Sequence, residues 1–280
     1  MNACFDEIVK RLRGGVRVAV VCPDDDHTKT TMKRFSEGGE ATFCPVGGSP
    51  AEAAARAVAM VRGGEADVLM KGLVSTDILL RAVLDKEHGL LPAGEVMSHV
   101  AAAQVPSYHK MILFSDAAVI PRPDMRCFDA MLRHDLRVFR ALNDTAPRVA
   151  LIHCNEKTSD KFPVTLCYEE LTARAVRGVY GDIRIGGPMD IRTAFDAYSA
   201  EVKGIHGSVA GDADILLFPE IEAANVFYKT LATLAGARTA GVLTGTTAPV
   251  VVPSRADSID AKCLSLAVAC VMAQAQQQIR

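Results

Sequence analysis

The sequence lacks a surplus of charge of either sign and lacks any apolar run long enough to cross a membrane. Its 31 Lys and Arg residues nearly balance 33 Asp and Glu residues, which gives a formal net charge of -2. This balance gives no reason to expect nucleic acid or an anionic membrane as a partner. Apolar stretches such as 213–218 and 248–253 have the length of strands, well short of the ~18 residues of a membrane helix. We therefore expect a soluble protein.

Two further features are absent: a secretory signal and a cysteine framework. The N-terminal residues are acidic, with Asp6 and Glu7, and show no apolar signal segment. The eight cysteines form no CxxC pair and no Cys/His cluster with zinc spacing. Several of them, such as Cys22 and Cys154, lie inside apolar segments, which is typical of buried and reduced thiols. We expect a cytoplasmic protein with no bound metal.

Short apolar runs alternate with longer amphipathic stretches along the whole chain. The runs predict strands at 16–22, 41–45, 66–71, 110–114, 148–154, 213–218, 239–243 and 249–253. The stretches predict helices at 26–37, 50–61, 76–86, 126–142, 165–177, 191–203, 221–235 and 258–277. Repeated strand–helix alternation predicts an α/β fold with mostly parallel sheets and helices covering them.

Ligands in such folds collect beyond the carboxyl ends of the strands, so polar residues that directly follow an apolar run are candidates. After Val250-Val251-Val252 come Ser254, Arg255 and Asp257, where a long helix begins. A helix N-terminus and a guanidinium fork both suit a phosphate anion. A capped helix with a surface arginine would have the same sequence, so both interpretations stay open.

A second candidate follows the strand that ends at Lys71. Gly72 permits close approach of the backbone to a ligand, and Lys71 offers a point charge for phosphate. Ser75 and Thr76 then begin a helix. No GxxxxGK run is present, so this segment is not a P-loop, and an ordinary strand–helix turn is the simpler interpretation.

Three other places carry polar residues that suit a ligand less specifically. Ser98-His99 is followed by Val100 and three alanines, a setting in which a histidine is more often structural. Ser208 precedes the run at 213–218, and Asn225, Tyr228 and Lys229 follow that run at helical spacing. The acidic residues Asp24-Asp25-Asp26, and the aspartates at 182 and 190, suggest a metal site. The acidic triple, however, has the pattern of a solvated loop.

Taken together, these blocks resemble one known family, the phosphate acetyl- and butyryltransferases. The segment from Ala66 to Thr76 and the segment from Leu80 to Glu87 resemble the N-terminal lobe of the butyryl branch, with Ser98-His99 at its serine–histidine pair. The stretch from Ser208 to Lys229 resembles the signature that both branches share, and Ala248 to Ser258 is most similar to the butyryl branch. The blocks span about residues 66 to 262 in order.

The resemblance implies a two-lobed fold of the isocitrate/isopropylmalate dehydrogenase type and a homodimer or higher homo-oligomer. It implies a first lobe of residues 1–125 and 256–280, a second lobe of residues 126–255, and an active site in the interlobe cleft. The Pro121-Arg122-Pro123 segment agrees with a boundary near residue 125, because the two prolines interrupt the pattern.

The implied reaction is acyl-CoA plus phosphate giving acyl phosphate plus CoA, with CoA as a substrate and no permanently bound cofactor. Ser254 and Arg255 occupy the serine–arginine pair of the family. Lys71, Gly72, Ser75, Thr76, Ser98, His99, Ser208, Asn225, Tyr228 and Lys229 are the expected substrate-binding residues. Direct attack in a ternary complex makes positioning and charge stabilisation the main tasks of these residues.

The sequence departs from the acetyl branch at the residue expected to take the thiol proton. The base aspartate of that branch falls on Ala261, its acidic neighbour falls on Asp260, and its cysteine falls on Asp257. Asp260 is our first candidate for the base and Asp257 the second, and a reaction without a dedicated base stays open.

Three alternatives remain. The first is a phosphate acetyltransferase with the same chemistry, because one methylene gives only about 1–3 kcal/mol of discrimination. The second is a catalytically impaired protein that binds CoA or acyl phosphate. The third is a fold-related metal- and NAD-dependent decarboxylating dehydrogenase, which would need clustered aspartates for a divalent metal and an arginine cluster for a dicarboxylate. The sequence shows no such constellation and no GxGxxG motif.

Overall fold

The computed structural model describes residues 4–278, which divide into two compact units. Unit 1 consists of Cys4 and residues 98–237, and unit 2 consists of residues 5–97 and 238–278. These bounds differ from the expected 125/126 and 255/256. The strands that begin at Ser98 and Ile112 pair with each other and join the sheet of unit 1, and the strands that begin at Arg238 and Val250 belong with unit 2.

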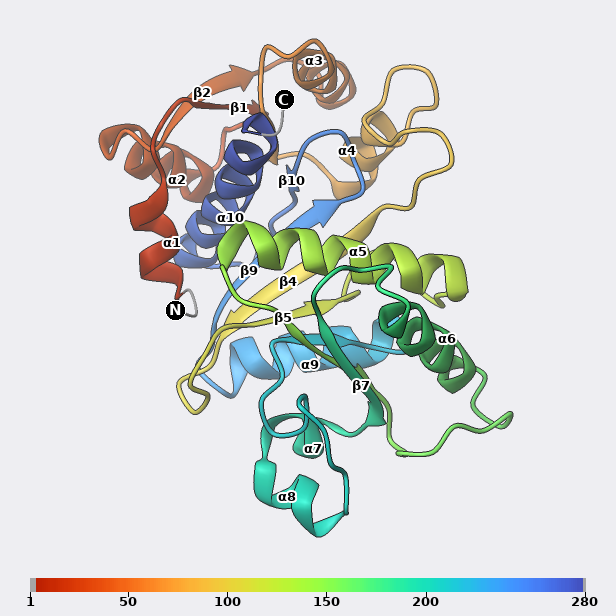
Figure 1. Cartoon of the computed structure of the whole chain (residues 1–280). Helices are drawn as coiled ribbons and strands as arrows, with labels where there is room; N and C mark the ends of the chain where they lie inside the picture. The colour runs from red at the N-terminus through yellow and green to blue at the C-terminus, as the bar shows by residue number, and fades with distance from the viewer. Residues whose placement is uncertain (1–3, 279–280) are drawn as a thin grey trace. The chain divides into compact units, whose positions relative to one another are not determined.

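Unit 2 is a five-stranded sheet with helices around it (Figure 1). Its elements are α1 (Phe5–Arg11), β1 (Val16–Val21), α2 (Asp26–Glu37), β2 (Ala41–Val46), α3 (Pro50–Arg62), β3 (Val68–Lys71), α4 (Thr76–Val83), β9 (Arg238–Thr244), β10 (Val250–Val251) and α10 (Ile259–Gln277). The strand order is β2-β1-β3-β10-β9. All neighbours are parallel except β10 and β9.

The long helix α10 fills the middle of unit 2. It contacts β9, α2 and α1, and Figure 1 shows it in blue beside these elements. Residues 262–273 of this helix are all buried. A helix that is apolar on nearly every side belongs in the interior of a domain, so α10 is the central helix of this unit.

Unit 1 contains five strands and the helices that cover them. Its elements are β4 (Ser98–Gln104), β5 (Ile112–Ser115), α5 (Met125–Leu142), β6 (Arg148–Ile152), α6 (Val164–Val176), β7 (Arg184–Met189), α7 (Ile191–Phe195), α8 (Ala197–Val202), β8 (Ile215–Leu217) and α9 (Ile221–Thr233). The strand order is β4-β5-β8-β6-β7, with only β4 and β5 antiparallel.

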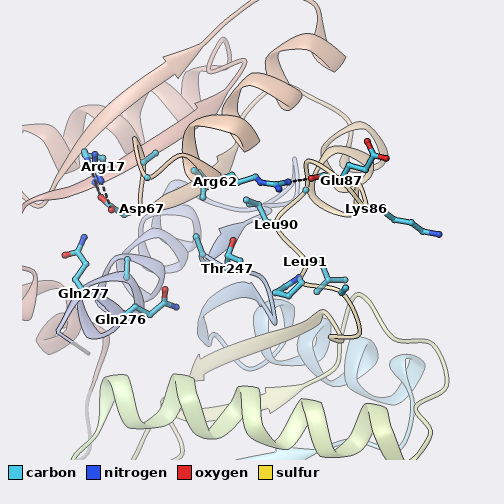
Figure 2. A pocket seen from close by; sticks show the side chains of 18 residues that line it. Arg17, Arg62, Asp67, Lys86, Glu87, Leu90, Leu91, Thr247, Gln276 and Gln277 are labelled. Carbon is cyan, nitrogen blue, oxygen red and sulfur yellow. Dashed lines mark hydrogen bonds and ion pairs between the residues drawn. The ribbon is translucent and has the colours of Figure 1, made fainter. Parts of the chain in front are cut away.

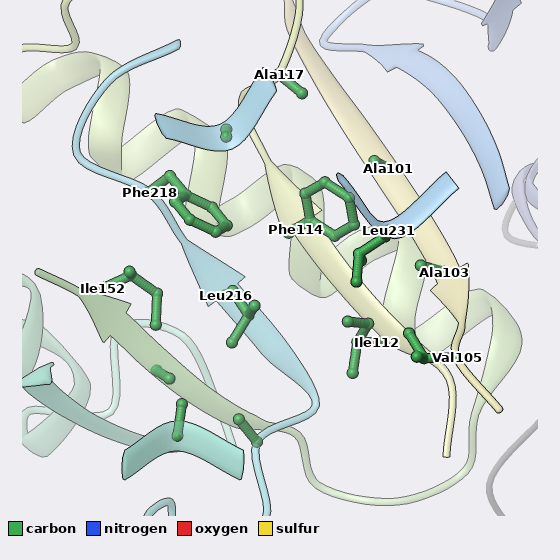
Figure 3. Packing of buried hydrophobic residues seen from close by; sticks show 14 of the residues in the cluster. Ala101, Ala103, Val105, Ile112, Phe114, Ala117, Ile152, Leu216, Phe218 and Leu231 are labelled. Carbon is green, nitrogen blue, oxygen red and sulfur yellow. The ribbon is translucent and has the colours of Figure 1, made fainter. Parts of the chain in front are cut away.

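The core of unit 1 lies on both faces of this sheet. One face carries Phe114 and Leu216, which pack with Phe218 and with Leu231 of α9 (Figure 3). Successive side chains of a strand point to opposite faces. Helix α5 contacts β4, β5 and β8, and it buries a stripe that includes Phe128. The sheet is therefore covered on both sides, as its apolar strands require.

The α/β fold with mostly parallel sheets is confirmed, and each predicted strand and helix has a counterpart, with one helix divided. The predicted helix at 191–203 is two helices, because the Asp196 carboxylate accepts hydrogen bonds from Tyr198 N and Ser199 N and so begins α8. Three elements were missed: α1, β4 and β7. The sequence of β4 is rich in alanine, and that of β7 contains Gly186, Gly187 and Pro188, which are uncommon in strands.

Candidate active site

The carboxyl ends of β1, β3 and β10 lie at one edge of the sheet of unit 2, because these strands are parallel. A pocket of about 280 Å³ opens at this edge. It is lined by Asp25, Asp26, His27, Lys71, Gly72, Leu73, Pro253, Ser254, Arg255 and Lys262. Four of the predicted site residues, Lys71, Gly72, Ser254 and Arg255, are therefore brought together.

The turn after β3 holds the first two of these residues. Gly72 N donates to Val21 O at 2.9 Å, and Leu73 N donates to Cys22 O at 2.6 Å. A Cβ at position 72 would lie 2.4 Å from Cys22 O. Glycine is required here by the close approach of β1, a reason other than the predicted approach of a ligand. The Ser75 hydroxyl accepts from Ile78 N and caps α4, so Ser75 and Thr76 begin that helix as expected, outside the residues that line the pocket.

The loop between β10 and α10 presents Ser254 and Arg255, both exposed. The Asp257 carboxylate accepts a hydrogen bond from Ser254 N at 2.7 Å, and Asp257 N donates to Ser254 O at 3.2 Å. Ser258 then caps α10 by accepting from Ala261 N. Asp257 thus closes a tight turn that fixes the backbone of Ser254 at the pocket.

Two buried lysines face this pocket, Lys71 and Lys262, each about 5% exposed. Lys71 Nζ donates to Val74 O at 3.2 Å and lies 3.4 Å from Gly72 O. Burial, and then the positive charges of Lys262 and Arg255, lower the pKa of Lys71 below its ordinary value. The pocket therefore concentrates positive charge in a place with little water.

Sequence reasoning missed Lys262 and gave Asp25, which it placed in a solvated loop, no role in the pocket. The Asp25 carboxylate caps α2 by accepting from Thr28 N at 2.9 Å. Its Oδ1 also lies 3.5 Å from Lys262 Nζ. Burial acts to raise the pKa of Asp25, but the bonds from Thr28 and the charge of Lys262 outweigh it and lower the pKa. A lysine within the apolar run of α10 was the available signal for Lys262.

Asp260, our first candidate for the base, does not line the pocket. Its two carboxylate oxygens lie 3.1 and 3.3 Å from Nε and Nη2 of Arg238. Arg238 also donates to Asp6 at 2.8 Å. Asp260 is thus part of a surface ion network that joins α1, β9 and α10.

In unit 1, strand β4 begins with Ser98 and His99, and the first of these lies inside the unit. Ser98 is fully buried, and its hydroxyl lies 2.7 Å from Nδ1 of His134 on α5. Burial, followed by the charge of Arg137, lowers the pKa of His134 to about 4, so this imidazole is neutral at ordinary pH. The Ser98 hydroxyl is therefore held by α5 inside the unit.

Asp116 organises the backbone around His99. Its carboxylate accepts from His99 N at 2.9 Å and from Ala118 N and Val119 N at 2.8 Å each. On α9, Asn225 Nδ2 donates to Ala117 O at 2.9 Å. These bonds tie the end of β5 to the beginnings of β4 and α9.

The rings of His99 and Tyr228 lie edge to face, with centroids 6.4 Å apart. Lys229 Nζ lies 5.0 Å from the centre of the Tyr228 ring. Of the predicted residues in unit 1, His99, Asn225, Tyr228 and Lys229 are thus linked to one another or to one loop. Ser208 is exposed on the loop before β8 and shares none of these contacts.

A second cavity, of about 500 Å³, lies at the amino ends of the same strands of unit 2 (Figure 2). Arg17 and Asp67 point toward each other there, with Nε and Nη2 of Arg17 at 3.0 and 2.9 Å from the two carboxylate oxygens. Arg62 donates to the backbone oxygen of Glu87. None of the predicted site residues lines this cavity.

Within residues 4–278, no group of three or more His, Cys, Asp and Glu side chains is arranged to hold a metal ion. Over the same residues, no helix has both the length and the apolar character needed to span a membrane.

The profile of the family described as "Phosphate acetyl/butaryl transferase" matches residues 29–270. A phosphate butyryltransferase of Clostridium beijerinckii is 36% identical over 98% of this chain and 99% of its own length. The chain belongs to the phosphate acetyl/butyryl transferase family. The predicted resemblance is thereby confirmed, and the match begins well before residue 66, where the recognised blocks start.

Members of both branches of this family are similar to the chain. A phosphate acetyltransferase of Thermotoga maritima is 36% identical over 96% of this chain and 99% of its own length. Among solved structures, a branched-chain phosphotransacylase from Enterococcus faecalis superposes with a TM-score of 0.81 at 26% identity, covering 92% of this chain and 99% of that chain. A phosphotransacetylase from Streptococcus pyogenes, at 18% identity, shares the fold with a TM-score of 0.83.

Proposed function

We propose that this protein transfers a short acyl group, butyryl or similar, between coenzyme A and inorganic phosphate. The reaction is acyl-CoA plus phosphate giving acyl phosphate plus CoA, by direct attack in a ternary complex. The observation that carries the proposal is the pocket in unit 2, in which the family pair Ser254 and Arg255 stands beside Lys71. The membership of the chain in the family supports the same reaction.

The residue types of the pocket suit this chemistry. A phosphate oxygen attacks the thioester carbonyl carbon, the C–S bond breaks, and CoA leaves as the thiolate or takes up a proton. We assign to Arg255 the binding of phosphate or acyl phosphate oxygens through its planar fork. We assign to Ser254 a hydrogen bond to the CoA sulfur or to the developing oxyanion, where a fixed donor lowers the barrier.

For the thiol proton we now favour Asp257 over Asp260. Asp257 lies in the turn that carries Ser254, whereas both oxygens of Asp260 face Arg238. In the direction from acyl phosphate to acyl-CoA, the base accepts the thiol proton, whose ordinary pKa is about 8.5. A reaction in which the thiol ionises without a dedicated base remains the alternative.

The other predicted residues are assigned to acyl-CoA. In unit 1 these are His99, Asn225, Tyr228, Lys229 and Ser208, which combine hydrogen-bonding groups, a ring and a positive charge. In unit 2 they are Ser75 and Thr76 at the beginning of α4. We assign Ser98 an indirect role, because its hydroxyl is buried against His134.

The butyryl branch is the first choice for the acyl chain, and the acetyl branch is the second. Support for the first comes from the Clostridium relative and from the branched-chain enzyme of similar structure. The Thermotoga relative, equally identical, supports the second. One methylene changes binding by only about 1–3 kcal/mol, so chain length is a matter for measurement.

We further propose a cytoplasmic location and a homodimer or higher homo-oligomer. All eight cysteines are free thiols in the structure, which agrees with a reducing compartment. Large apolar side chains such as Val226 and Leu234, which are 65% and 81% exposed, are available for contacts between copies. Light scattering coupled to gel filtration measures the oligomeric state directly.

The first experiment measures release of free CoA thiol from acetyl-, propionyl-, butyryl- and isobutyryl-CoA, with and without phosphate and with no added metal. We expect release that requires phosphate and is fastest with a four-carbon acyl group, as judged by kcat/KM. Equal release without phosphate would contradict the proposal. No release with any acyl-CoA, together with retained binding of CoA, would identify a catalytically impaired protein.

The base is tested by comparing Asp257→Asn with Asp260→Asn in the direction that consumes the CoA thiol. We expect Asp257→Asn to lower kcat and to change its dependence on pH, since general bases contribute typically about 10²–10⁴-fold. Asp260→Asn should keep the wild-type profile. If only Asp260→Asn changes the profile, the assignment returns to Asp260, and if neither does, no dedicated base acts.

A further inference from the structure

In the unit 2 pocket, the ammonium groups of the buried residues Lys71 and Lys262 are not fully paired with carboxylates. None of the described carboxylates lies within ion-pair distance of Lys71, whose ammonium contacts only backbone oxygens. Lys262 has one carboxylate near it, Asp25, at 3.5 Å. The same oxygen of Asp25 also accepts the hydrogen bond that caps α2. Both ammonium groups belong to residues about 5% exposed.

A buried charge is costly unless it is paired and hydrogen-bonded. Lys110 in unit 1 shows how this chain satisfies such a group when its role is structural. Its ammonium lies 2.9 Å from Asp212 and 2.7 Å from Asp214, two carboxylates for one cation. Lys262 has one carboxylate at a longer distance and Lys71 has none within ion-pair distance, and Arg255 adds a third positive charge to the same pocket. This arrangement suits a ligand with more than one negative charge.

The pocket also contains acidic groups and a histidine, which shape what it accepts. Asp26 and His27 belong to the first turn of α2 and are exposed, so water screens them. Asp257 lies outside the residues that line the pocket, and its carboxylate accepts a hydrogen bond from Ser254 N. The partly buried Asp25 is the carboxylate within ion-pair distance of a buried lysine, Lys262.

We propose that Lys71 and Lys262 bind the tetrahedral phosphoryl group of inorganic phosphate or acyl phosphate, and that Asp25 is the counterion that this group displaces from Lys262. The proposal rests on the proposed acyl transfer and adds to it three residues, of which sequence reasoning missed two. Arg255 holds the reacting phosphate from the loop, while the two ammonium groups hold it from β3 and α10. Compact ammonium groups act here as point charges.

The test uses Lys262→Met and Lys71→Met, which keep most of the side-chain volume and remove the charge. We expect KM for phosphate to rise roughly tenfold to a hundredfold, as for loss of a hydrogen bond to a charged group, while KM for acyl-CoA changes little. Lys71 has no carboxylate partner, so Lys71→Met should not lower Tm, whereas Lys262→Met leaves Asp25 without its lysine and should lower Tm modestly. Lys33→Met, which removes an exposed lysine on α2, is the matched control and should behave as wild type.

Asp25→Asn gives an effect of the opposite sign. Asparagine caps a helix about as well as aspartate, so α2 is retained. Removal of the competing charge should lower KM for phosphate several-fold. A raised KM for phosphate in Asp25→Asn would contradict the role of Asp25 as a displaced counterion.

Binding of inorganic phosphate alone, followed as the rise in Tm with phosphate concentration in the absence of acyl-CoA, separates this inference from the proposed function. We expect the rise in wild type and its loss in Lys262→Met. An unchanged phosphate response and KM in both lysine variants, or an increase confined to KM for acyl-CoA, would overturn the inference. A phosphate response that depends on Lys262 in a protein without acyl transfer would support the anion site and overturn the proposed reaction.

Discussion

The two edges of the unit 2 sheet differ in how their positively charged side chains are paired. At the amino edge, Arg17 makes three hydrogen bonds to the Asp67 carboxylate, from its backbone N–H and from two guanidinium nitrogens. At the carboxyl edge, Lys71 has only carbonyl partners and Arg255 is exposed on a loop. Both edges carry a cavity. Our proposal of an anion site at the carboxyl edge rests on this difference in compensation more than on the presence of a cavity.

The helices that begin and end at the two edges also differ in the charge that they favour. Helices α2 and α10 begin at the carboxyl edge, where their free N–H groups and dipoles favour anions. The end of α10 lies at the amino edge, where Gln276 and Gln277 line the cavity. The negative end of the α10 dipole and the Asp67 carboxylate both favour the Arg17 cation at that edge.

The largest effect is expected for Arg255→Ala. Loss of the guanidinium should lower kcat/KM by about 10³-fold or more, because a charge-assisted contact to the reacting phosphate is lost. The phosphate-dependent thiol assay measures this change. Arg56→Ala, which removes an exposed arginine on α3, is the control and should keep full activity. Near-normal activity of Arg255→Ala would contradict a phosphate-binding role for Arg255 and so for the carboxyl edge.

The next effect concerns His134, a buried group that the fold keeps neutral. Its pKa is lowered to about 4 by burial and by Arg137, against about 6.5 in an unfolded chain. The unfolded chain therefore binds more protons between about pH 4 and 6.5, and stability is lost as the pH falls through this window.

His134→Gln should remove this dependence. Relative to the variant, wild type should gain about 3 kcal/mol of unfolding free energy from pH 4 to pH 6.5, since each pKa unit is worth about 1.4 kcal/mol. Urea unfolding at several pH values measures the difference. Parallel pH profiles of the two proteins would show that His134 is not held neutral.

Asp135, next to His134 on α5, should affect the pH dependence of stability in the opposite direction. It is fully buried, and Ser115 donates to its Oδ2 at 2.7 Å. Burial raises the pKa of Asp135 well above the ordinary value, the hydrogen bond from Ser115 opposes this, and the charge of Asp116 adds to the increase. The folded state therefore keeps a proton that the unfolded chain releases above about pH 4.

For wild type, this proton makes stability fall as the pH rises from about 4 toward the folded pKa, by up to about 1.4 kcal/mol per pH unit. Asp135→Asn cannot ionise, so its unfolding free energy should not show this decline. The comparison uses urea unfolding at pH 5, 6 and 7. A difference between the two proteins that does not vary with pH would contradict a protonated Asp135.

The smallest effect is expected at the amino edge, for Asp67→Asn. Burial acts to raise the pKa of Asp67, but the bonds and charge of Arg17 outweigh it and lower the pKa. The stabilisation is present above about pH 4 and is lost as the pH falls through the folded pKa. We expect a loss of about 1–2 kcal/mol of unfolding free energy at pH 7 that shrinks as the pH falls below about 4, with KM for phosphate unchanged. A large increase in KM for phosphate would contradict the proposal that phosphate binds at the carboxyl edge and not at the amino edge.

Much of the architecture followed from the sequence, because apolar periodicity reports burial. The apolar runs at 16–22, 148–154 and 239–243 correspond to β1, β6 and β9, and the long stretch after Ser258 corresponds to α10. The positions of Ser254 and Lys71 followed from the same pattern, since both come directly after strands whose carboxyl ends meet at one edge.

Other elements depended on neighbours that no local pattern reports. The β4 sequence Ser-His-Val-Ala-Ala-Ala-Gln favours a helix by composition, and it is a strand because it pairs with β5 and is covered by α5. Strand β7 contains glycines and a proline and forms through its pairing with β6. The division near residues 97 and 237 follows from these pairings, and the prolines at 121 and 123 only interrupt a connection.

The sequence by itself thus determined the α/β class, the family and the residues that follow the strand ends. The tertiary structure alone decided which charges meet. It placed Lys262 and Asp25, 237 residues apart, at one pocket, and it engaged Asp260 with Arg238 and Ser98 with His134. The physical reason is that periodicity encodes how one face of an element is buried, whereas a charge acquires its role from the partner that long-range packing brings to it.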